Sequence, residues 1–412
     1  MKYGLIGEHL GHSFSKLVHG ELADYDYDLC EIKPEKLNEF LENKDFLGIN
    51  VTIPYKEKVI PKLDTIDDAA VAIGAVNTIV NRAGKLSGYN TDFYGMSELI
   101  KHAGVEVKNK KAAILGSGGT SKTAFAVLNA LGAREMLRVS RSAKDGAITY
   151  DDLYAEHRDI EIIINTTPSG MYPNNDDAPI VLSRFEKLCG VIDAIYNPLR
   201  TKLILSAKER GIAAEGGLYM LIAQAVRASE IFLGVTYPDG MTESVYDRMI
   251  RDKENIVLIG MPASGKSTVG AILAKELCRE LIDTDALIVE REGMAISDIF
   301  AKHGEAYFRD VEAEVVREAS KTGGKIISTG GGAILRRDSV RALSENGRIY
   351  FIDRPLSALV PTDSRPLSSD RTSIEKRYHE RYDIYKASCD VIIDADCDAM
   401  NVAKKITENF KK

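Results

Sequence analysis

The 412-residue sequence contains no tryptophan, five cysteines, and no apolar run approaching the ~20 residues of a membrane-spanning helix. The cysteines are odd in number and none forms a CxxC pair, which argues against a disulfide framework and against a zinc site. We therefore expect reduced, buried thiols at Cys30, Cys189, Cys278, Cys389 and Cys397. The N-terminal apolar run is too short for a signal peptide, so we expect a cytosolic protein.

The sequence also lacks a strong excess of either charge, since its formal net charge is −7 with acidic and basic residues well mixed. This pattern argues against a polycationic face for nucleic acid or for a membrane surface, and leaves small anionic substrates open. The length exceeds what one hydrophobic core usually serves, so we expect two or three domains. The oligomeric state stays open, a homodimer being one option.

The most specific motif is a P-loop that runs from Gly260 to Thr268. The apolar run 255–259 predicts a strand before it, and the apolar spacing over 269–277 predicts a helix after it. Such a loop binds nucleotide phosphates through backbone N–H groups, a helix N-terminus and a lysine, while a serine hydroxyl holds Mg²⁺. The predicted ATP-binding residues are Gly260, Ala263, Ser264, Gly265, Lys266, Ser267 and Thr268.

A second glycine-rich turn, at 116–121, lies between a predicted strand at 111–115 and a predicted helix at 122–131. This order is typical of the first turn of a dinucleotide-binding fold, although Ser121 replaces the third glycine. The next predicted strand, 136–139, leads to Arg141, which favours NADP because an arginine there accepts the 2′-phosphate. A solvated turn arginine is the alternative.

The predicted NADP-binding residues come from the glycine turn, from the end of the following strand, from the loop after strand 160–165, and from a glycine pair before a long helix. They are Gly116, Ser117, Gly118, Gly119, Thr120, Ser140, Arg141, Thr166, Met171 and Gly217.

Polar residues also gather in the first hundred residues. A polar cluster from Asn50 to Lys56 begins at the carboxyl end of a strand expected at 46–52. Its position there indicates a crevice at the edge of an open α/β sheet. Ser13 and Ser15 open a predicted helix, where N-capping is the simpler interpretation. We expect a hairpin at 74–78 and a helix at 93–102.

Residues 1 to about 245 resemble shikimate dehydrogenase. The resemblance rests on motifs in that family's order: His12-Ser13-x-Ser15, Asn50-Val51-Thr52-x-Pro54-x-Lys56, Gly74-Ala75-Val76-Asn77-Thr78, Asn90-Thr91-Asp92, Gly116-x-Gly118-Gly119, Tyr196-x-Pro198 and Gly217-x-x-Met220-Leu221-x-x-Gln224. The sequence departs from the family's pattern at two positions. Lys16 stands where the family usually has a proline, and the basic residue that the family has after Arg141 is displaced here to Lys144, which leaves the strength of the NADP preference open.

This resemblance implies the reduction of 3-dehydroshikimate to shikimate by NADPH, with Lys56 as proton donor and acceptor beside Asp92. A lysine next to a carboxylate suits that chemistry because it supplies charge and a proton to the developing alkoxide. The implied substrate-binding residues are Ser13 and Ser15, at the carboxylate, and Asn50, Thr52, Asn77, Asp92, Tyr196 and Gln224.

In the last third of the chain, a strand predicted at 281–285 would place Asp283 and Asp285 on one side. Asp283 could then face Mg²⁺ and Asp285 a substrate, with a helix N-cap at Asp285 as the rival interpretation. A helix carries Phe308-Arg309-x-x-Glu312, and strand 325–328 leads to three glycines at 330–332, whose bare backbone lets a ligand approach closely.

Residues 255–412 resemble shikimate kinase through the P-loop, Asp283-x-Asp285, Phe308-Arg309-x-x-Glu312, the triple glycine, Arg365-Pro366-Leu367 and Arg381 before Tyr385. The resemblance implies phosphorylation of shikimate by MgATP, with Ser267 and Asp283 at the metal. It implies that Asp285 engages the ring hydroxyls and serves as base, that Arg309, Gly331 and Arg381 hold the carboxylate, and that Arg365 binds ATP from a lid. Asp383 replaces a family proline, and the lid segment is short.

We therefore predict an α/β protein of three domains. They are an open α/β substrate-binding domain (1–95 plus 217–250), a Rossmann-like NADP domain (96–216) and a parallel α/β/α P-loop domain of the nucleoside-monophosphate-kinase type (255–412), the last joined by a short charged linker at 251–254. The predicted function is a bifunctional enzyme that makes shikimate and then shikimate 3-phosphate. The alternatives are a quinate/shikimate dehydrogenase fused to a kinase of another small hydroxy acid, and a fusion with one degenerate, regulatory half.

Overall fold

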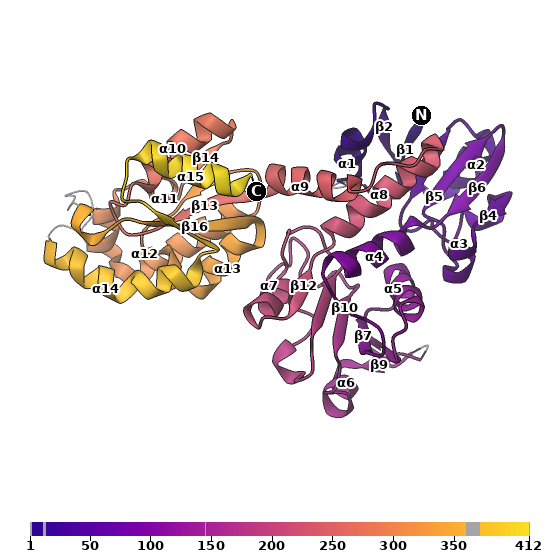
Figure 1. Cartoon of the computed structure of the whole chain (residues 1–412), viewed down its shortest axis with the longest axis horizontal. Coiled ribbons are helices and arrows are strands. Elements are labelled where there is room, and N and C mark those ends of the chain that lie inside the picture. The colour runs from indigo at the N-terminus through magenta and orange to yellow at the C-terminus, as the bar shows by residue number, and fades with distance from the viewer. Residues whose placement is uncertain (1, 11–13, 145, 360–370, 412) are drawn as a thin grey trace. The chain divides into compact units, whose positions relative to one another are not determined.

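The computed structural model describes residues 2–10, 14–144, 146–359 and 371–411 (Figure 1). The chain divides into two compact units, Met1–Met249 and Ile250–Lys412, and each is described by itself. The boundary falls inside helix α9 (Met241–Lys253), so the charged segment expected as a linker is helical up to Lys253. Among the described residues, no helix combines the length and the apolar character that a membrane span requires.

The first sheet of unit Met1–Met249 is mixed, with the strand order β2-β1-β3-β5-β6-β4. Strand β1 runs parallel to β2 and β3, whereas β5 is antiparallel to β3 and β6. Its strands are β1 (Tyr3–Gly7), β2 (Tyr27–Glu31), β3 (Gly48–Val51), β4 (Thr65–Ile66), β5 (Thr78–Arg82) and β6 (Lys85–Tyr89). The α-helices of this part are α1 (Ser15–Leu22), α2 (Leu37–Asn43) and α3 (Asp68–Ile73).

The hairpin predicted at 74–78 lies later in the chain. Gly74 has φ 72° and ends α3, and the segment after it leads into β5. The hairpin itself joins β5 to β6 through Ala83 and Gly84, which both have positive φ. The prediction was wrong because Gly74 serves as a helix C-cap, a position that favours glycine for the same left-handed backbone that a hairpin turn needs.

The second sheet is fully parallel, with the order β12-β11-β10-β7-β8-β9. The elements of this part are α4 (Thr91–His102), β7 (Lys111–Leu115), α5 (Gly119–Ala130), β8 (Glu135–Ser140), β9 (Ile148–Thr149), α6 (Tyr150–Glu156), β10 (Ile162–Asn165), β11 (Gly190–Asp193), α7 (Lys202–Glu209), β12 (Ala213–Glu215) and α8 (Leu218–Leu233). The strand predicted at 111–115 is confirmed as β7.

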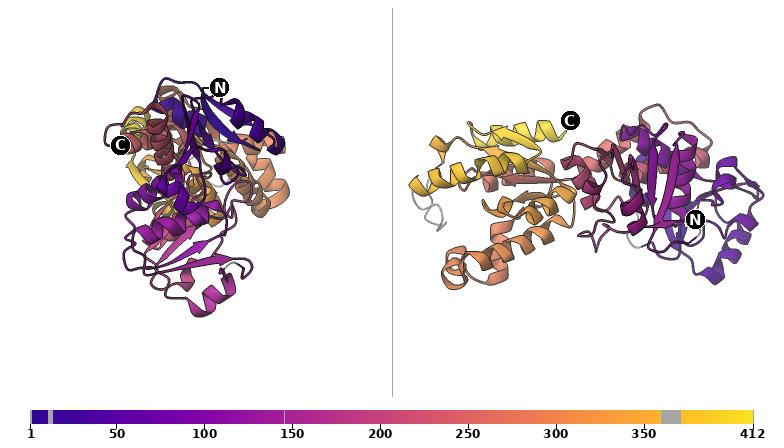
Figure 2. Two further views of the ribbon diagram at one scale, coloured as in Figure 1. Left: turned by 90° about the vertical axis from the view of Figure 1, so that its right-hand side faces the viewer. Right: turned by 90° about the horizontal axis from the view of Figure 1, so that it is seen from below.

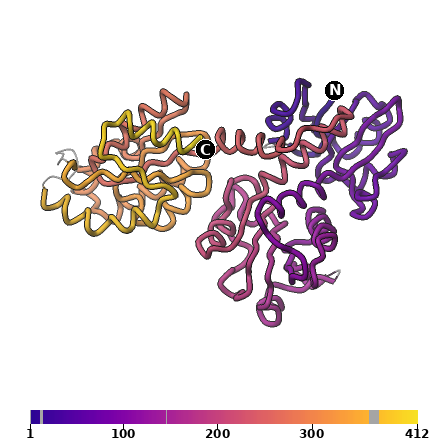
Figure 3. Tube along the Cα trace, viewed as in Figure 1, coloured from indigo at the N-terminus to yellow at the C-terminus, as the bar shows by residue number. Residues whose placement is uncertain are grey.

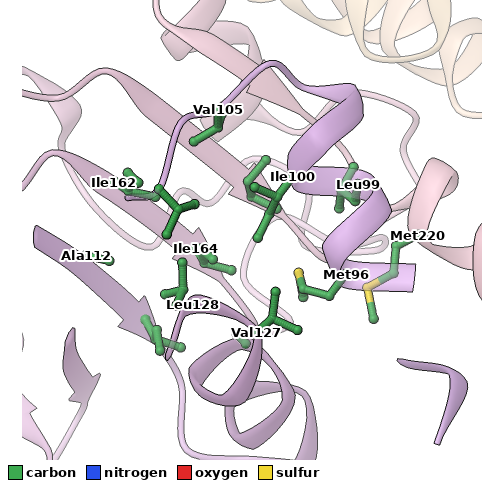
Figure 4. Close-up of a cluster of buried hydrophobic side chains, with 14 of the residues drawn as sticks. Met96, Leu99, Ile100, Val105, Ala112, Val127, Leu128, Ile162, Ile164 and Met220 are labelled. Atoms are coloured by element: carbon green, nitrogen blue, oxygen red, sulfur yellow. The ribbon is translucent and has the colours of Figure 1, made fainter. Parts of the chain in front are cut away.

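Alternate residues of these strands face opposite layers of helices. Ile162 and Ile164 pack with α4, α5 and α8, in the cluster that Figure 4 shows. Ile163, between them, packs with residues of α6 and α7. Because successive side chains of a strand point to opposite faces, a strand buried on both faces is apolar throughout, which explains the continuous Ile-Ile-Ile run of β10.

Helix α8 contributes to the cores of both sheets. Met220 and Ala223, in its first half, belong to the cluster on the second sheet. Ala228 and Phe232, in its second half, pack against Val80 of the first sheet. The helix therefore connects the part of the unit that contains the first sheet to the part that contains the second.

The second unit has one fully parallel sheet, with the order β14-β15-β13-β16-β17. Figure 3 traces the backbone of the whole chain, and most of this unit has its orange and yellow colours. Its elements are β13 (Asn255–Ile259), α10 (Lys266–Leu277), β14 (Leu281–Asp283), α11 (Thr284–Glu292), α12 (Ile296–Ser320), β15 (Ile326–Ser328), α13 (Arg337–Asn346), β16 (Gly347–Asp353), α14 (Arg371–Ser388), β17 (Val391–Asp394) and α15 (Ala399–Phe410). The strand predicted at 255–259 is confirmed as β13.

This sheet lies between two layers of helices, as the right-hand view in Figure 2 also shows. Leu258 packs with residues of α10 and α15, whereas Val257 packs with residues of α12, α13 and α14. Helix α12 is interrupted at Gly304, which has φ 84° and ψ 171°, so the predicted helix with Phe308 and Glu312 is its second part. The parallel α/β/α prediction for this unit is confirmed.

All five cysteines are unpaired thiols, but none of them is buried. Cys189 and Cys278 are exposed, because Cys189 precedes β11 and Cys278 caps α10 in a left-handed conformation. The remaining three are partly exposed. The expectation that the thiols are buried is therefore wrong, since these positions lie at the ends of elements.

We expect Gly95→Ala to lower the free energy of unfolding by about 1–3 kcal/mol, because α4 touches α8 at this residue. A Cβ at Gly95 would lie 2.7 Å from the carbonyl oxygen of Met220 and 3.1 Å from Cβ of Gln224. Urea unfolding of the full chain, followed by circular dichroism, measures the change.

The matched control is Gly20→Ala in helix α1, where no described atom lies within 4 Å of the added Cβ. There we expect a gain of about 0.5–1 kcal/mol, since alanine loses less conformational entropy in a helix than glycine. Equal effects of the two substitutions would contradict the close packing of α4 on α8.

Candidate active sites

A cavity of about 440 Å³ in the first unit is lined by residues of the first sheet and by residues of the helices and loops next to the second sheet. The structure brings most of the predicted dehydrogenase residues together around it. From the predicted substrate site these are Ser15, Asn50, Thr52, Lys56, Asn77, Asp92, Tyr196 and Gln224, and from the predicted cofactor site they are Gly119, Thr120 and Gly217. Ser13 lies outside the described residues.

Lys56 and Asp92 form an ion pair in this cavity. Lys56 Nζ donates to Asp92 Oδ2 at 2.5 Å, and Asn77 Nδ2 donates to Asp92 Oδ1 at 2.9 Å. Asp92 lies in the first turn of α4, where the helix dipole also favours a carboxylate. Only 25% of the Lys56 side chain and 11% of the Asp92 side chain is exposed, so water screens this ion pair less than a surface pair.

Ser15 is the first residue of α1, and the N-cap position belongs to Phe14, which has no side-chain capping bond. The capping interpretation of Ser15 is therefore wrong. Its side chain lines the cavity, as does that of His19 one helical turn later. Sequence reasoning missed His19, although its spacing of four residues from Ser15 places both on one face of the helix.

Gln224 adds a buried polar group to the cavity. Its Oε1 has no hydrogen-bond partner among the described residues. A buried acceptor without a partner costs free energy, so this site suits a ligand that brings a donor.

Tyr196 is carried by a loop that Asp193 organises at the end of β11. Asp193 Oδ1 accepts from the Ile195 N–H and from Asn165 Nδ2, both at 3.0 Å, while its Oδ2 accepts from Thr201 Oγ1 at 2.7 Å. Burial raises the pKa of the Asp193 carboxyl to about 7, against these three bonds, which lower it. Through Asn165, the same network connects this loop to the one that follows β10.

The glycine turn before α5 fits the phosphates of a dinucleotide. Gly118 is the N-cap of α5 without a side-chain capping bond, and no described atom lies within 4 Å of a Cβ placed on Gly118 or Gly119. Backbone N–H groups of the first turn are thus accessible to an anion. Gly116 has φ 113°, and a Cβ there would lie 2.7 Å from Thr166 Oγ1, so the turn needs glycine at this position.

The remaining predicted NADP residues lie at or after the carboxyl ends of β7, β8 and β10. Ser117 is exposed within the glycine turn, and Arg141 is exposed just after β8, next to Ser140, whose hydroxyl bonds to Ser142. Thr166 donates to the carbonyl of Leu115 at 2.6 Å, which ties the loop after β10 to the end of β7. Met171 is 45% exposed and is not among the residues that line the cavity.

The P-loop of the second unit surrounds the buried ammonium group of Lys266. Lys266 Nζ donates to the carbonyls of Gly260 and Met261, both at 2.9 Å. Ala263 has φ 65° and Gly265 has φ 92°, and this left-handed backbone helps turn N–H groups inward. Ser264 Oγ is buried and has no partner among the described residues, and Thr268 is exposed on the first turn of α10.

Two residues predicted at a metal lie together beside this loop. Ser267 Oγ donates to Asp283 Oδ2 at 2.7 Å. A hydroxyl and a carboxylate side by side fit Mg²⁺, which prefers oxygen ligands and keeps several waters. Among the described residues no group of three or more His, Cys, Asp or Glu side chains could hold a metal.

The predicted strand through Asp285 and the rival cap at Asp285 are both wrong. Strand β14 ends at Asp283, and Asp283 is the N-cap of α11, because its Oδ1 accepts from the N–H of Asp285 at 3.0 Å. Asp285 instead lies in the first turn of α11, close to Gly330, where a Cβ would come within 2.5 Å of its Oδ1. The helix, rather than strand alternation, therefore positions this carboxylate.

Charged residues of α12 and α14 meet the same glycine loop. Arg309 Nη1 donates to Glu312 Oε2 at 2.6 Å and its Nη2 to Glu305 Oε1 at 3.0 Å. Burial raises the pKa of the Glu312 carboxyl, although Arg309 opposes this. A Cβ at Gly332 would overlap the Arg309 guanidinium, so the loop backbone lies against that group. Sequence reasoning left Glu312 without a role.

Arg381 Nη1 and the hydroxyl of Tyr385 both donate to the carbonyl of Gly331, at 3.1 and 2.6 Å. Arg309, Gly331 and Arg381 are thus brought to one loop. Arg365 lies outside the described residues.

Comparisons with known proteins cover both units. A family model described as shikimate kinase matches residues 262–411, and one described as the shikimate dehydrogenase substrate binding domain matches residues 5–79. A shikimate dehydrogenase (NADP(+)) of Clostridium perfringens (strain SM101 / Type A) is 38% identical over 265 residues, which are 60% of this chain and 97% of that protein.

Solved structures agree for the first unit. Shikimate dehydrogenase 1 of Peptoclostridium difficile has 34% identity and a TM-score of 0.56, covering 60% of this chain and 98% of that one. A Thermus thermophilus shikimate 5-dehydrogenase in complex with NADP(H) and shikimate has 26% identity and a TM-score of 0.55, covering 60% of this chain and 99% of that one. The chain belongs to the shikimate dehydrogenase family in its first unit and carries a shikimate kinase domain in its second, a fusion of two families that act in the shikimate pathway.

Proposed function

We propose that the chain catalyses two consecutive reactions: reduction of 3-dehydroshikimate to shikimate with NADPH, and phosphorylation of shikimate to shikimate 3-phosphate with MgATP. The observation that supports the first reaction is the Lys56–Asp92 pair. It lies in a cavity that Gly119 and Thr120 of the glycine turn also line. A proton donor and a hydride donor then meet at one carbonyl group.

In the first reaction NADPH, when bound, supplies the hydride. The Lys56 ammonium gives its proton to the carbonyl oxygen as negative charge develops there, and the resulting amine takes a proton back from solvent. Asp92 holds the ammonium in place. In the reverse direction Lys56 accepts the hydroxyl proton.

The substrate is held by neutral groups around this pair. Ser15, together with Ser13, donates hydroxyl hydrogen bonds to the substrate carboxylate. Thr52, Asn77 and Tyr196 contact the ring hydroxyls. Gln224 accepts from one of them through its Oε1, for which the described part of the chain provides no partner. Asn50 completes this wall of the cavity.

In the second reaction the P-loop backbone and Lys266 hold the ATP phosphates, and Arg365 adds a positive charge at the γ-phosphate. Ser267 and Asp283 would hold Mg²⁺, which neutralises phosphate charge when bound. Asp285 orients the hydroxyl that attacks and accepts its proton. Arg309 and Arg381 bind the carboxylate, with Gly331 giving close access to the backbone.

Lys56→Ala should lower kcat for 3-dehydroshikimate reduction by roughly 10²–10⁴-fold, because the positioned proton donor is lost. NADPH oxidation measures this, and shikimate phosphorylation by the same preparation should be unchanged. Lys58→Ala is the matched control, since this lysine is exposed two residues further on. A similar loss in both variants would argue against Lys56 as the donor.

Lys266→Ala should lower kcat for phosphorylation by roughly 10²–10³-fold and leave NADPH oxidation intact, because one charge that stabilises the transferred phosphoryl group is removed. ADP release with shikimate as substrate is the measurement. Lys275→Ala, on the exposed side of the same helix, is the control. Loss of both activities in Lys266→Ala would contradict independent sites.

Arg141→Asp should lower the ratio of kcat/KM for NADPH over NADH by roughly ten- to a hundredfold, since charge-assisted bonds to the 2′-phosphate are replaced by repulsion. Steady-state kinetics with both cofactors give the ratio. An unchanged ratio would show that another residue selects the cofactor.

A further inference from the structure

A row of hydrogen bonds leads from Tyr27 to Asp92. The Tyr27 hydroxyl donates to Asn50 Oδ1 at 2.7 Å, and Asn50 Nδ2 donates to Thr78 Oγ1 at 3.0 Å. Thr78 Oγ1 then donates to Asn77 Oδ1 at 3.1 Å, and Asn77 Nδ2 donates to Asp92 Oδ1 at 2.9 Å. The row ends on the carboxylate oxygen next to the one that Lys56 contacts.

All four bonds in this row point the same way. Each residue between Tyr27 and Asp92 accepts from the previous residue and donates to the next. Every donor is therefore directed toward the Asp92 charge. Chains of hydrogen bonds in a low-dielectric interior polarise one another, and a bond to an ionised acceptor is the strongest kind. Loss of the Tyr27 donor should therefore weaken the other hydrogen bonds of the row as well.

The register of the first sheet creates the row. Asn50 on β3 pairs directly with Thr78 on β5, and it also pairs with Leu5 on β1. Tyr27 on β2 pairs with Tyr3, two residues before Leu5 and thus on the same face. The long phenol side chain of Tyr27 can then reach diagonally across β1 to the Asn50 amide.

Burial makes these bonds hard to replace. Tyr27 is 3% exposed, Thr78 is fully buried, and Asn77 is 5% exposed. The His19 ring stacks on the Tyr27 ring with a centroid distance of 3.9 Å and an interplanar angle of 9°, which fixes the phenol. Burial lowers the pKa of His19 to about 3, with Asn50 opposing, so the stacked imidazole is neutral.

We propose that Tyr27 is a positioning residue of the dehydrogenase reaction, which holds Asp92, and through it Lys56, in the orientation for proton transfer. Tyr27 acts through Asn50, Thr78 and Asn77 and is not among the residues that line the cavity. The inference rests on the proposed function, in which Lys56 gives its proton to the substrate oxygen.

Tyr25 is the matched control on the same segment. Its hydroxyl also contacts His19, with 2.5 Å between the oxygen and Nδ1, and it donates to Ser229 Oγ of α8 at 3.1 Å. The bond to Ser229 leads to α8, and the contact with His19 leads to α1; neither is a hydrogen bond of the row that ends at Asp92. Tyr25→Phe and Tyr27→Phe thus remove the same atom from two nearby tyrosines, of which Tyr25 is partly buried and Tyr27 is buried. Only the second substitution removes the start of the row.

The experiment compares both variants of the full-length chain with the wild type. Tyr27→Phe should lower kcat for 3-dehydroshikimate reduction roughly tenfold with KM changed less than about twofold, because a misoriented proton donor slows the chemical step. The primary isotope effect with NADPH deuterated at the transferred hydride should rise, since that step becomes more rate-limiting. Tyr25→Phe should change neither quantity.

A second pair of variants breaks the row in the middle. Thr78→Val removes the hydroxyl at nearly constant volume and should reproduce the lower kcat and the larger isotope effect. Thr78→Ser restores a hydroxyl and should recover most of the rate. This pair applies even if Tyr27→Phe does not fold, and shikimate phosphorylation by the second unit checks the integrity of each preparation.

Three results would overturn the inference and leave the proposed function intact. The first is an equal effect of Tyr27→Phe and Tyr25→Phe on kcat and on the isotope effect. The second is a rise in KM alone, which would indicate a role in substrate binding, and the third is equal kcat in Thr78→Val and Thr78→Ser. A wild-type chain that does not oxidise NADPH with 3-dehydroshikimate would overturn the proposed function itself, and this inference with it.

Discussion

The carboxyl ends of parallel strands are the constraint on which both sites depend. Strands β7, β10 and β11 end at one edge of their sheet, and the glycine turn, the Thr166 loop and the Asp193 loop follow them there. Strands β13, β14 and β15 likewise end next to the P-loop, Asp283 and the glycine loop at 330–332. Parallel pairing thus brings residues that are far apart in the chain within contact, as Ser267 and Ser328 show at 3.4 Å.

The two sites treat charge differently. The dehydrogenase cavity contains the Lys56–Asp92 ion pair, and the neutral amide of Asn77 donates to the second oxygen of the carboxylate. The glycine loop of the kinase domain is surrounded by buried guanidinium groups, and Arg309 already has two carboxylate partners. A buried charge requires such partners, so each site carries the donors and counter-charges that its burial demands.

Several features were predictable from the sequence because they depend on local spacing. The strands at 111–115 and 255–259, the glycine turn and the P-loop are contiguous motifs whose residue types suit only a few backbone conformations. Errors arose where one residue type serves two local structures. Gly74 ends a helix instead of turning a hairpin, since glycine is favoured both at helix C-caps and in turns. Asp283 rather than Asp285 caps α11, because either aspartate could serve as the cap.

The sequence by itself determined the two families, the α/β class and the residue types at both sites, because these reside in motifs that are read along the chain. Only the tertiary structure decided that the Tyr27 phenol reaches Asn50, that Gln224 Oε1 is buried without a partner among the described residues, and that Arg309 lies against Gly332. These contacts depend on sheet register and helix packing, which join residues far apart in sequence, and no local pattern encodes them.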